Sequence, residues 1–498
     1  MDGPLLVIDR DGTRPVGEQL VAGLRRGILD GTLRPGDPVP STRALAAELG
    51  VARSSVVAAY DQLAGEGYLE LRQGASTRVA QLERGRIRAA TAATGAPTDA
   101  AAPAGIERAP LVDLRPGIPS TARLDERAWR AAWRDAARAG VPGTPAPPFG
   151  SPRLRAEIAD HLRQARGVAC SPDDIVVTAG TSDAIALLAS AIDAIVEGTP
   201  RVAVEHPGYP SARRVLARRG AVRTVPVAVD DDGIDVAALA AIRPAPHAAM
   251  VTPSHQYPLG GRLPVAARLA LLDWAEASGA LVIEDDYDSE FRHLGAPLPA
   301  LASLDRGGRV VLVGSFSKVL TPWVRLGYLV LPANPGLRAA VAAVRDDETC
   351  PVPGIAQEAI AALLASGAVR RHIAAARRDY AHRRRLVLEV LSGIEQAPLA
   401  GLDGGLHAVV HLPDHAAAAA VVARLEADGI AVAALGEYSA VPGAGPAGIV
   451  LGYAAPGDTR LAEALDAVRR VVLATLAGDG SRDTRAGGEL ERGPRTGG

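Results

Sequence analysis

One lysine offers the clearest chemistry in this sequence. Lys318 is the only lysine among 498 residues, and all other members of the 54 basic residues are arginine. The bias toward arginine could leave a single lysine by chance. Arginine, however, stays protonated because its pKa lies above about 12, whereas a buried lysine can lose its proton and form a Schiff base with an aldehyde. We therefore interpret Lys318 as a chemical rather than a surface residue.

An apolar run that ends in acids, "VIEDDYDSEF", could serve the same chemistry. A buried carboxylate needs a partner. Placed beneath a pyridine ring, Asp285 would hold a proton on the ring nitrogen and make the ring an electron sink. Tyr287, two residues on, could donate a hydrogen bond to a phenolate oxygen. Tyr209 in "VEHPGYP" is either a packed loop aromatic or a ring that stacks on the ligand.

Hydroxyl groups and one arginine near these runs would suit a phosphate ester. Thr181 and Ser182 follow a strand in "TAGTSDAI", where backbone N–H groups at the start of a helix can bind phosphate, although such residues can also be simple N-caps. Ser315 and Arg325 flank Lys318 in "GSFSKVLTPWVRLG", and a guanidinium pairs well with phosphate. An amine, a proton-holding acid, a ring stack and a phosphate cup together indicate pyridoxal phosphate (PLP) as the cofactor.

Alternating apolar runs and helical stretches must position these residues. Stretches rich in Ala and Leu separate the β-branched runs "DIVVTAG", "RVAVEHP", "AAMVTPS", "ALVIEDD" and "RVVLVGSFS". This alternation predicts an α/β domain over residues 111–476, with a mainly parallel sheet covered by helices. In such sheets ligands bind at the carboxyl ends of the strands, which is where the candidate residues lie.

Residues 10–80 have a different, mostly helical pattern. The first helical face is formed by Val16, Leu20, Leu24 and Ile28. A second helix is expected between Ser41, a good N-cap, and Gly50, and a third over "ARSSVVAAYDQLAGEGYL". Two short strand-like runs around a turn follow. This order of helix, helix, turn, helix and hairpin predicts an α+β winged helix-turn-helix.

The remaining segments and the composition limit the possible functions. Residues 81–110 are predicted to be a linker, and residues 477–498 a disordered tail. The net charge of −2 gives no overall field that favours nucleic acid or membrane. No signal peptide or membrane-length apolar run is evident, and two distant cysteines, Cys170 and Cys350, fit a reducing compartment. We therefore expect a cytoplasmic protein that does not bind membranes.

Both halves of the chain resemble known families. "LRPGDPVPSTRALAAELGVARSSVVAAYDQLAGEGYL" resembles the GntR-type winged helix, and "EHPGYP", "EDDYDSEF" and "GSFSKVL" resemble fold type I PLP-dependent aminotransferases. Their fusion is typical of MocR-type transcriptional regulators, and it implies a head-to-tail homodimer. The resemblance also implies these cofactor contacts: Lys318 as the Schiff-base lysine, Asp285 at the pyridine nitrogen, Tyr287 at the ring oxygen, Tyr209 stacked on the ring, and Thr181, Ser182, Ser315 and Arg325 around the phosphate.

Two departures from the aminotransferase pattern favour a regulator over an enzyme. Tyr257 and Leu259 in "SHQYPLGG" replace an Asn and a Thr, and in aminotransferases that Asn contacts the ring oxygen. MocR-type proteins often carry an aromatic residue there. Val450 in "GIVLGYA" replaces the Arg that grips a substrate carboxylate. We therefore predict weak or absent transamination, unless Arg292 or Arg345 reaches in to take that role.

Two hypotheses follow from the resemblance. The favoured one is a transcriptional regulator that binds PLP as a Schiff base and senses PLP or a small amino compound. It is similar to the PdxR-type branch of the family, which controls PLP synthesis. The alternative is an active PLP-dependent aminotransferase with a fused DNA-binding domain.

The DNA-binding hypothesis rests on placement rather than on charge. Residues 1–80 hold nine Arg against ten Asp plus Glu, so this domain is not basic. In helix-turn-helix folds the start of the second helix of the motif enters the major groove of double-stranded DNA. Arg53 could then approach base edges of an operator, and Ser54 and Ser55 could contact phosphates. Arg43 begins the preceding helix and Gly74 marks the wing tip, although such arginines can also be ordinary surface residues.

Overall fold

The computed structural model describes residues 8–9, 15–66, 68–70, 76–80, 112–218, 222–294 and 299–486. The chain divides into two units, Met1–Glu107 and Arg108–Gly498. The predicted linker, residues 81–110, lies outside the described residues, as does Gly74 at the predicted wing tip.

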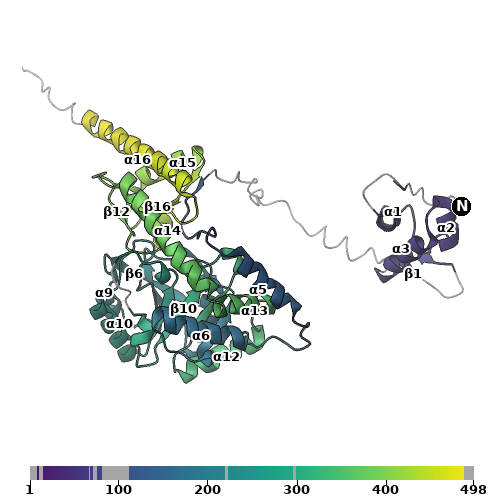
Figure 1. Ribbon diagram of the computed structural model, residues 1–498, viewed down its shortest axis with the longest axis horizontal. Coiled ribbons are helices and arrows are strands. Elements are labelled where there is room, and N and C mark those ends of the chain that lie inside the picture. The colour runs from purple at the N-terminus through teal and green to yellow at the C-terminus, as the bar shows by residue number, and fades with distance from the viewer. Residues whose placement is uncertain are drawn as a thin grey trace, which may run out of the picture. The chain divides into compact units, whose positions relative to one another are not determined.

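The first unit is a helix-turn-helix followed by a short hairpin (Figure 1). Its elements are α1 (Val16–Leu29), α2 (Thr42–Leu49), α3 (Arg53–Gly65), β1 (Leu69–Glu70) and β2 (Arg78–Val79). The predicted face of the first helix is buried, because Leu20, Leu24 and Ile28 pack against the other helices. Ser41 caps the start of α2 through its side chain, and Gly50 ends it with φ +62°. The predicted winged helix-turn-helix is confirmed in its described elements.

An eight-stranded sheet forms the centre of the second unit (Figure 1). Its strands, in spatial order, are β4 (Ile175–Thr178), β11 (Gly327–Val330), β10 (Val310–Ser315), β9 (Leu281–Asp286), β8 (Ala248–Val251), β5 (Arg201–His206), β6 (Arg223–Asp230) and β7 (Gly233–Ile234). The strands from β10 to β6 run parallel, whereas β11 is antiparallel to both of its neighbours and β7 to β6. All five apolar runs identified in the sequence are strands of this sheet, so the mainly parallel prediction is confirmed.

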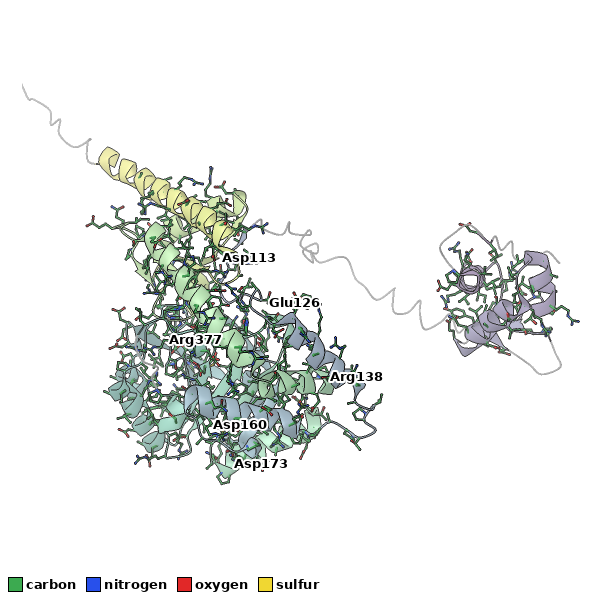
Figure 2. All side chains as sticks on the ribbon, in the orientation of Figure 1. Asp113, Glu126, Arg138, Asp160, Asp173 and Arg377 are labelled. Atoms are coloured by element: carbon green, nitrogen blue, oxygen red, sulfur yellow. The ribbon has the colours of Figure 1, made fainter. Side chains whose placement is uncertain are left out.

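Helices cover both faces of the sheet because its strands bury side chains on both sides. The helices are α5 (Glu126–Arg138), α6 (Pro152–Arg166), α7 (Thr181–Ile195), α8 (Pro210–Arg218), α9 (Val236–Ala241), α10 (Val265–Ser278), α11 (Leu301–Leu304), α12 (Pro335–Glu348), α13 (Gly354–Ala365) and α14 (Ala368–Leu391). Val204, Met250 and Ile283 face α7, α8 and α12, whereas Val251 and Val282 face α9 and α10. Figure 2 shows α5 with its ends, Glu126 and Arg138, beside this layered body.

Short 3₁₀ turns occur at Pro172–Asp174 (η1), Ser289–Phe291 (η2), Pro322–Val324 (η3) and Leu435–Tyr438 (η4). The turns η2 and η3 follow β9 and β10 in the chain, and η2 contributes Ser289 to a cavity considered below.

A second, smaller sheet completes the unit. Its strands are β12 (Leu399–Ala400), β13 (His407–His411), β16 (Gly448–Gly452) and β15 (Ala433–Ala434), and β14 (Ile430–Ala431) pairs with β3 (Val112–Asp113). The helices α15 (His415–Ala427) and α16 (Asp458–Ala486) pack together beside it.

The last helix is longer than the sequence indicated. Residues 477–486 continue α16 instead of forming part of a disordered tail, because extending an existing helix avoids the cost of nucleation. Residues 487–498 lie outside the described part. Within that part no single helix is long and apolar enough to cross a bilayer, although α13 and α14, bent by 71°, pass this test when taken together.

Candidate functional site

Five of the eight residues predicted to hold the cofactor line a single cavity, which we call the cofactor cavity. They are Lys318, Asp285, Tyr287, Tyr209 and Thr181. The cavity has an empty volume of about 550 Å³, including space open to solvent. The cavity lies at the carboxyl ends of β9 and β10, beside the loops that follow β5 and β8. Ligands of mainly parallel sheets are expected at this position.

Lys318 enters the cofactor cavity from the turn after β10, which the buried Phe316 anchors in the core. Its Nζ donates a hydrogen bond of 2.5 Å to the carbonyl of Gly117. Gly117 has φ +91°, a backbone conformation that favours glycine, and a Cβ there would lie 2.5 Å from Nζ, so a larger residue would also displace the amine. Burial lowers the pKa of Lys318, against the opposing charges of Asp288 and Asp285. The amine is therefore easier to deprotonate than a surface lysine.

Asp285 lies on β9, and one of its carboxyl oxygens has no hydrogen-bond partner among the described residues. The side chain is 5% exposed, and its Oδ1 has no hydrogen-bond partner among the described residues. Burial, and then the negative charge of Asp286, raise the pKa of Asp285 to about 7, although Lys318 acts in the opposite direction. The neighbouring Glu284 instead accepts backbone N–H groups at the start of α11, which is a structural role. A buried carboxyl with an unmatched oxygen beside an amine fits the ring nitrogen of PLP.

Tyrosines form much of the remaining wall. The Tyr257 ring lies edge-on to Tyr209, Tyr287 and Tyr438, with centroids 6.1, 5.4 and 5.3 Å away. Burial raises the pKa of Tyr209, Tyr257 and Tyr287, so all three are neutral hydroxyl groups near neutral pH. The Tyr257 hydroxyl lies 3.3 Å from that of Tyr438. The cavity can therefore hold an aromatic ring and donate hydrogen bonds to its oxygens.

A buried glutamate ties two of the cavity loops together. Glu205, at the end of β5, accepts hydrogen bonds from Thr252 N–H at 2.9 Å, Thr252 Oγ1 at 2.6 Å and Gln256 Nε2 at 3.2 Å. Burial raises the pKa of Glu205 to about 7, although these hydrogen bonds oppose the shift. The loops that carry Tyr209 and Tyr257 begin directly after this cluster, which fixes their positions.

The four residues predicted to bind phosphate gather at one edge of the sheet, but only Thr181 lines the cofactor cavity. Thr181 and Ser182 form the first turn of α7, after Gly180 with φ +79°. Ser315 ends β10, and its Oγ accepts a hydrogen bond of 3.1 Å from Ser317 N–H. The exposed Arg325 approaches the carbonyl of Ala179 at 3.4 Å, next to the same helix start. Their roles remain predictions.

No arginine replaces the one that Val450 lacks, because neither Arg292 nor Arg345 lines the cofactor cavity. Val450 is fully buried on β16, in an apolar cluster against which Tyr257 packs. Arg345 is 1% exposed and pairs with Asp183 at 2.8 Å beneath α7. Arg292 lines a neighbouring cavity. The ten described residues around the cofactor cavity thus include no arginine.

Sequence reasoning missed several residues of this site. Gly117, Thr252, Leu406 and His407 also line the cofactor cavity. Burial, together with the nearby His255, lowers the pKa of His407 to about 4, so this ring is neutral near neutral pH. Only the proline-flanked glycine in "RPGIP" and the small residue after "AAMV" gave any local signal.

The start of α3 carries the residues predicted to contact DNA. Arg53 and Ser54 are exposed in its first turn, and Ser55 is half-buried. Arg43 is exposed in the first turn of α2. These side chains are available to a ligand, and their contacts with DNA remain predictions.

Comparisons with known proteins cover both units. The family model of aminotransferase class I and II matches residues 110–468, and that of bacterial regulatory proteins of the gntR family matches residues 16–79. The chain is 44% identical to the HTH-type pyridoxine biosynthesis transcriptional regulator PdxR of Corynebacterium glutamicum, over 90% of this chain and 95% of the relative. It is 36% identical to the probable rhizopine catabolism regulatory protein MocR of Rhizobium meliloti, over 77% and 78%.

Solved structures match the second unit. LysN, an alpha-aminoadipate aminotransferase from Thermus thermophilus complexed with N-(5'-phosphopyridoxyl)-L-leucine, aligns with a TM-score of 0.65 and 25% identity, over 74% of this chain and 93% of that one. An archaeal alanine:glyoxylate aminotransferase aligns with a TM-score of 0.66 and 24% identity, over 72% and 90%. The chain therefore belongs to the MocR-type transcriptional regulators, in which a GntR-type DNA-binding domain precedes an aminotransferase class I/II domain.

Proposed function

We propose that this regulator binds PLP as a Schiff base on Lys318 and changes its binding to operator DNA in response to PLP itself. The observation that carries the proposal is that a buried amine and a carboxyl with an unmatched oxygen, Oδ1 of Asp285, line the same tyrosine-rich cavity. PLP would supply an aldehyde for the amine and a ring that withdraws electrons. The resemblance to a regulator named for pyridoxine biosynthesis supports genes of vitamin B6 supply as the target.

Each residue of the cavity has a proposed task. Lys318 provides the amine, Asp285 holds a proton at the ring nitrogen, and Tyr287 donates to the ring oxygen. Tyr209 stacks on the ring. The phosphate contacts come from Thr181, Ser182, Ser315 and Arg325. The family resemblance further supports a head-to-tail homodimer, which sedimentation of the full chain would test.

Titration of the unloaded protein with PLP tests the proposed function. We expect absorbance of a Schiff base to appear together with a change in affinity for DNA upstream of the protein's own gene. The loaded protein is then titrated with a panel of amino acids and amines. If PLP leaves DNA binding unchanged and one amino compound shifts it, the effector is that compound and not PLP.

Little or no transamination is expected, although the aminotransferase relatives make activity the second candidate function. The carboxylate of an α-amino acid needs a charged partner in a buried site, and Val450 lies in the apolar cluster behind Tyr257. Incubating the loaded protein with alanine, aspartate or glutamate should leave its absorbance unchanged over many minutes. Stoichiometric release of the matching keto acid would identify an enzyme instead.

Arg53→Ala is expected to weaken operator binding by about 1–3 kcal/mol, because a bidentate arginine contact to a base contributes that much discrimination. Binding is measured by fluorescence anisotropy on operator and on random DNA at one salt concentration. The matched control is Arg26→Ala, which removes an exposed arginine of the same domain from α1. An equal loss on both DNAs would make Arg53 a phosphate contact, and PLP binding should be unaffected throughout.

A further inference from the structure

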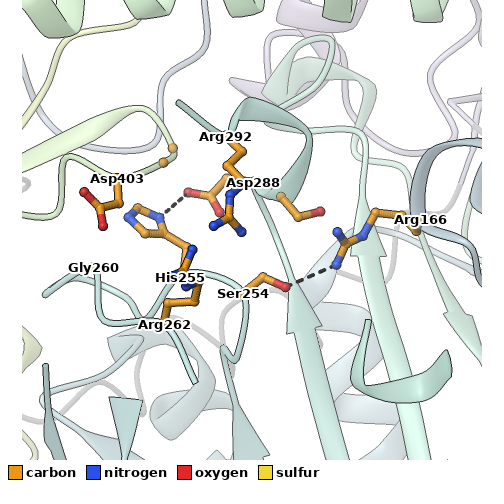
Figure 3. Close-up of a pocket in the computed structure, with 11 residues that line it drawn as sticks. Arg166, Ser254, His255, Gly260, Arg262, Asp288, Arg292 and Asp403 are labelled. Carbon is orange, nitrogen blue, oxygen red and sulfur yellow. Dashed lines mark hydrogen bonds and ion pairs between the residues drawn. The ribbon is translucent and has the colours of Figure 1, made fainter. Parts of the chain in front are cut away.

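A second cavity, which shares none of its lining residues with the cofactor cavity, contains three arginines (Figure 3). We call it the arginine cavity and define it by Arg166, Arg262, Arg292, Ser254 and Ser289. Its empty volume is about 400 Å³, including space open to solvent. These side chains come from the end of α6, the loop between β8 and α10, and the residues around η2. His255, Asp288 and Asp403 complete its charged lining.

Within the part of the chain that the structure describes, the cavity contains a buried donor that lacks a partner. Arg292 Nη2 is buried without a partner among the described residues. Arg292 is a donor only, and its Nε is already used by the carbonyl of Leu294 at 2.7 Å. No hydrogen bond or ion pair is described for the exposed Arg262. An acceptor ligand would satisfy groups that otherwise cost free energy.

His255 adds positive charge to the lining because of its partner. Its Nδ1 lies 2.8 Å from Asp288 Oδ2, so this nitrogen carries a proton toward the carboxylate. Burial acts against protonation, but the charge of Asp288 raises the pKa of His255 overall. In the protonated ring Nε2 is also a donor, and the backbone carbonyl of Gly401 lies close enough to favour the proton.

The charges also limit which acceptor can bind. Arg166 is largely neutralised, because it pairs with Asp286 at 2.7 Å and donates to Ser254 Oγ at 3.1 Å. Arg262 and Arg292 are left to bind an anion, against the nearby Asp403 at the exposed side. Because His255 offsets Asp288, two cations face one carboxylate, and this net positive charge suits a single negative charge rather than a dianion. A guanidinium fork matches a carboxylate in shape as well as charge.

We propose that the arginine cavity is a second ligand site that binds a small monocarboxylate through Arg292 and Arg262. The site does not require the Schiff base, because none of these groups belongs to the cofactor contacts. An α-amino acid and a simple carboxylic acid share this chemistry. Asp403 could contact the ammonium group of the former.

The test uses full-length Lys318→Ala protein, which cannot form the Schiff base. Acetate, glycine and phosphate are titrated by calorimetry, with chloride at matched ionic strength as the reference. We expect acetate and glycine to bind and phosphate to bind more weakly than either. Arg292→Gln should weaken acetate binding by roughly tenfold, as expected for loss of a charged hydrogen bond. The exposed Arg262 allows a second variant, Arg262→Gln, that keeps the test valid if Arg292→Gln does not fold.

Arg134→Gln is the matched control, since Arg134 is exposed on α5 and lines neither cavity. It should bind acetate like its parent. Equal binding by all three arginine variants, tighter binding of phosphate than of acetate, or no difference between acetate and chloride would overturn the proposal. Tighter binding of glycine than of acetate supports it and identifies amino acids as the ligands. A failed cofactor proposal would leave these results unchanged.

Discussion

Lys318→Arg protein that is mixed with PLP and reduced with borohydride is expected to carry no pyridoxyl group, whereas the wild-type chain carries one. The reason is that the guanidinium keeps its charge but cannot act as a free primary amine. Few background adducts are expected, because Lys318 is the only lysine and the α-amino group is the only other primary amine of the chain. Intact-protein mass spectrometry therefore reads the result directly.

A matched control tests whether PLP reacts with any lysine or only with a lysine in the cofactor cavity. Arg134→Lys in the Lys318→Arg background places a lysine on the exposed surface of α5. It should gain little adduct at stoichiometric PLP, since its amine stays protonated and has no phosphate site beside it. A pyridoxyl group on the Lys318→Arg chain itself, at any residue of the cavity, would refute the assignment.

Asp285→Asn is expected to weaken PLP binding by about 1.5–3 kcal/mol, the usual contribution of a hydrogen bond to a charged group. The amide can accept from the ring N–H but does not stabilise a positive charge on it. Affinity is measured by fluorescence titration of the unloaded protein. The control is Asp193→Asn, which makes the same change at an exposed position of α7. Unchanged affinity in Asp285→Asn would remove this residue from the ring nitrogen.

Without the cofactor the same substitution should stabilise the protein at alkaline pH. Burial raises the pKa of Asp285 from 3.8 to about 7, so the folded state binds the proton more tightly than the unfolded state. Stability contributed by this group is present below about pH 4, falls as pH rises to about 7, and stays low above. Urea unfolding at pH 5 and pH 8 should show Asp285→Asn gaining on the wild type as pH rises. With PLP bound, we expect the wild type to be more stable than Asp285→Asn, because only the carboxylate stabilises a positive charge on the ring.

The residues that could be predicted are those whose local sequence carries their function. Asp285 lies near the end of an apolar strand, and Tyr287 and Lys318 follow such strands within a few residues, so the sheet alone brings them to one edge. Gly117 and His407 could not be assigned to this site from the sequence, because they reach the cofactor cavity from segments about 200 and 90 residues away from Lys318. The contact of Lys318 with a carbonyl depends on tertiary packing, and a backbone oxygen leaves no mark in the sequence.

The two arginines considered as carboxylate partners show the same limit. Arg345 lies in a helix, and only the fold reveals that Asp183 holds it. The sequence indicated that Arg292 was near the site but not which of two cavities it lines. In the first unit, the helices α1 to α3 could be predicted because local hydrophobic periodicity and capping residues set their boundaries. Ser41 and Gly50, which cap the two ends of α2, are examples.

The His255 ring connects two compartments. It lines the arginine cavity, while its Nδ1 lies 3.0 Å from the Tyr287 hydroxyl on the wall of the cofactor cavity. A ligand in either cavity would therefore lie near the same imidazole. Linkage is reciprocal, so a carboxylate that tightens PLP binding by some factor is itself bound tighter by that factor once PLP is present. If the two ligands are coupled through this ring, the concentration of PLP to which the regulator responds would depend on how much carboxylate is present.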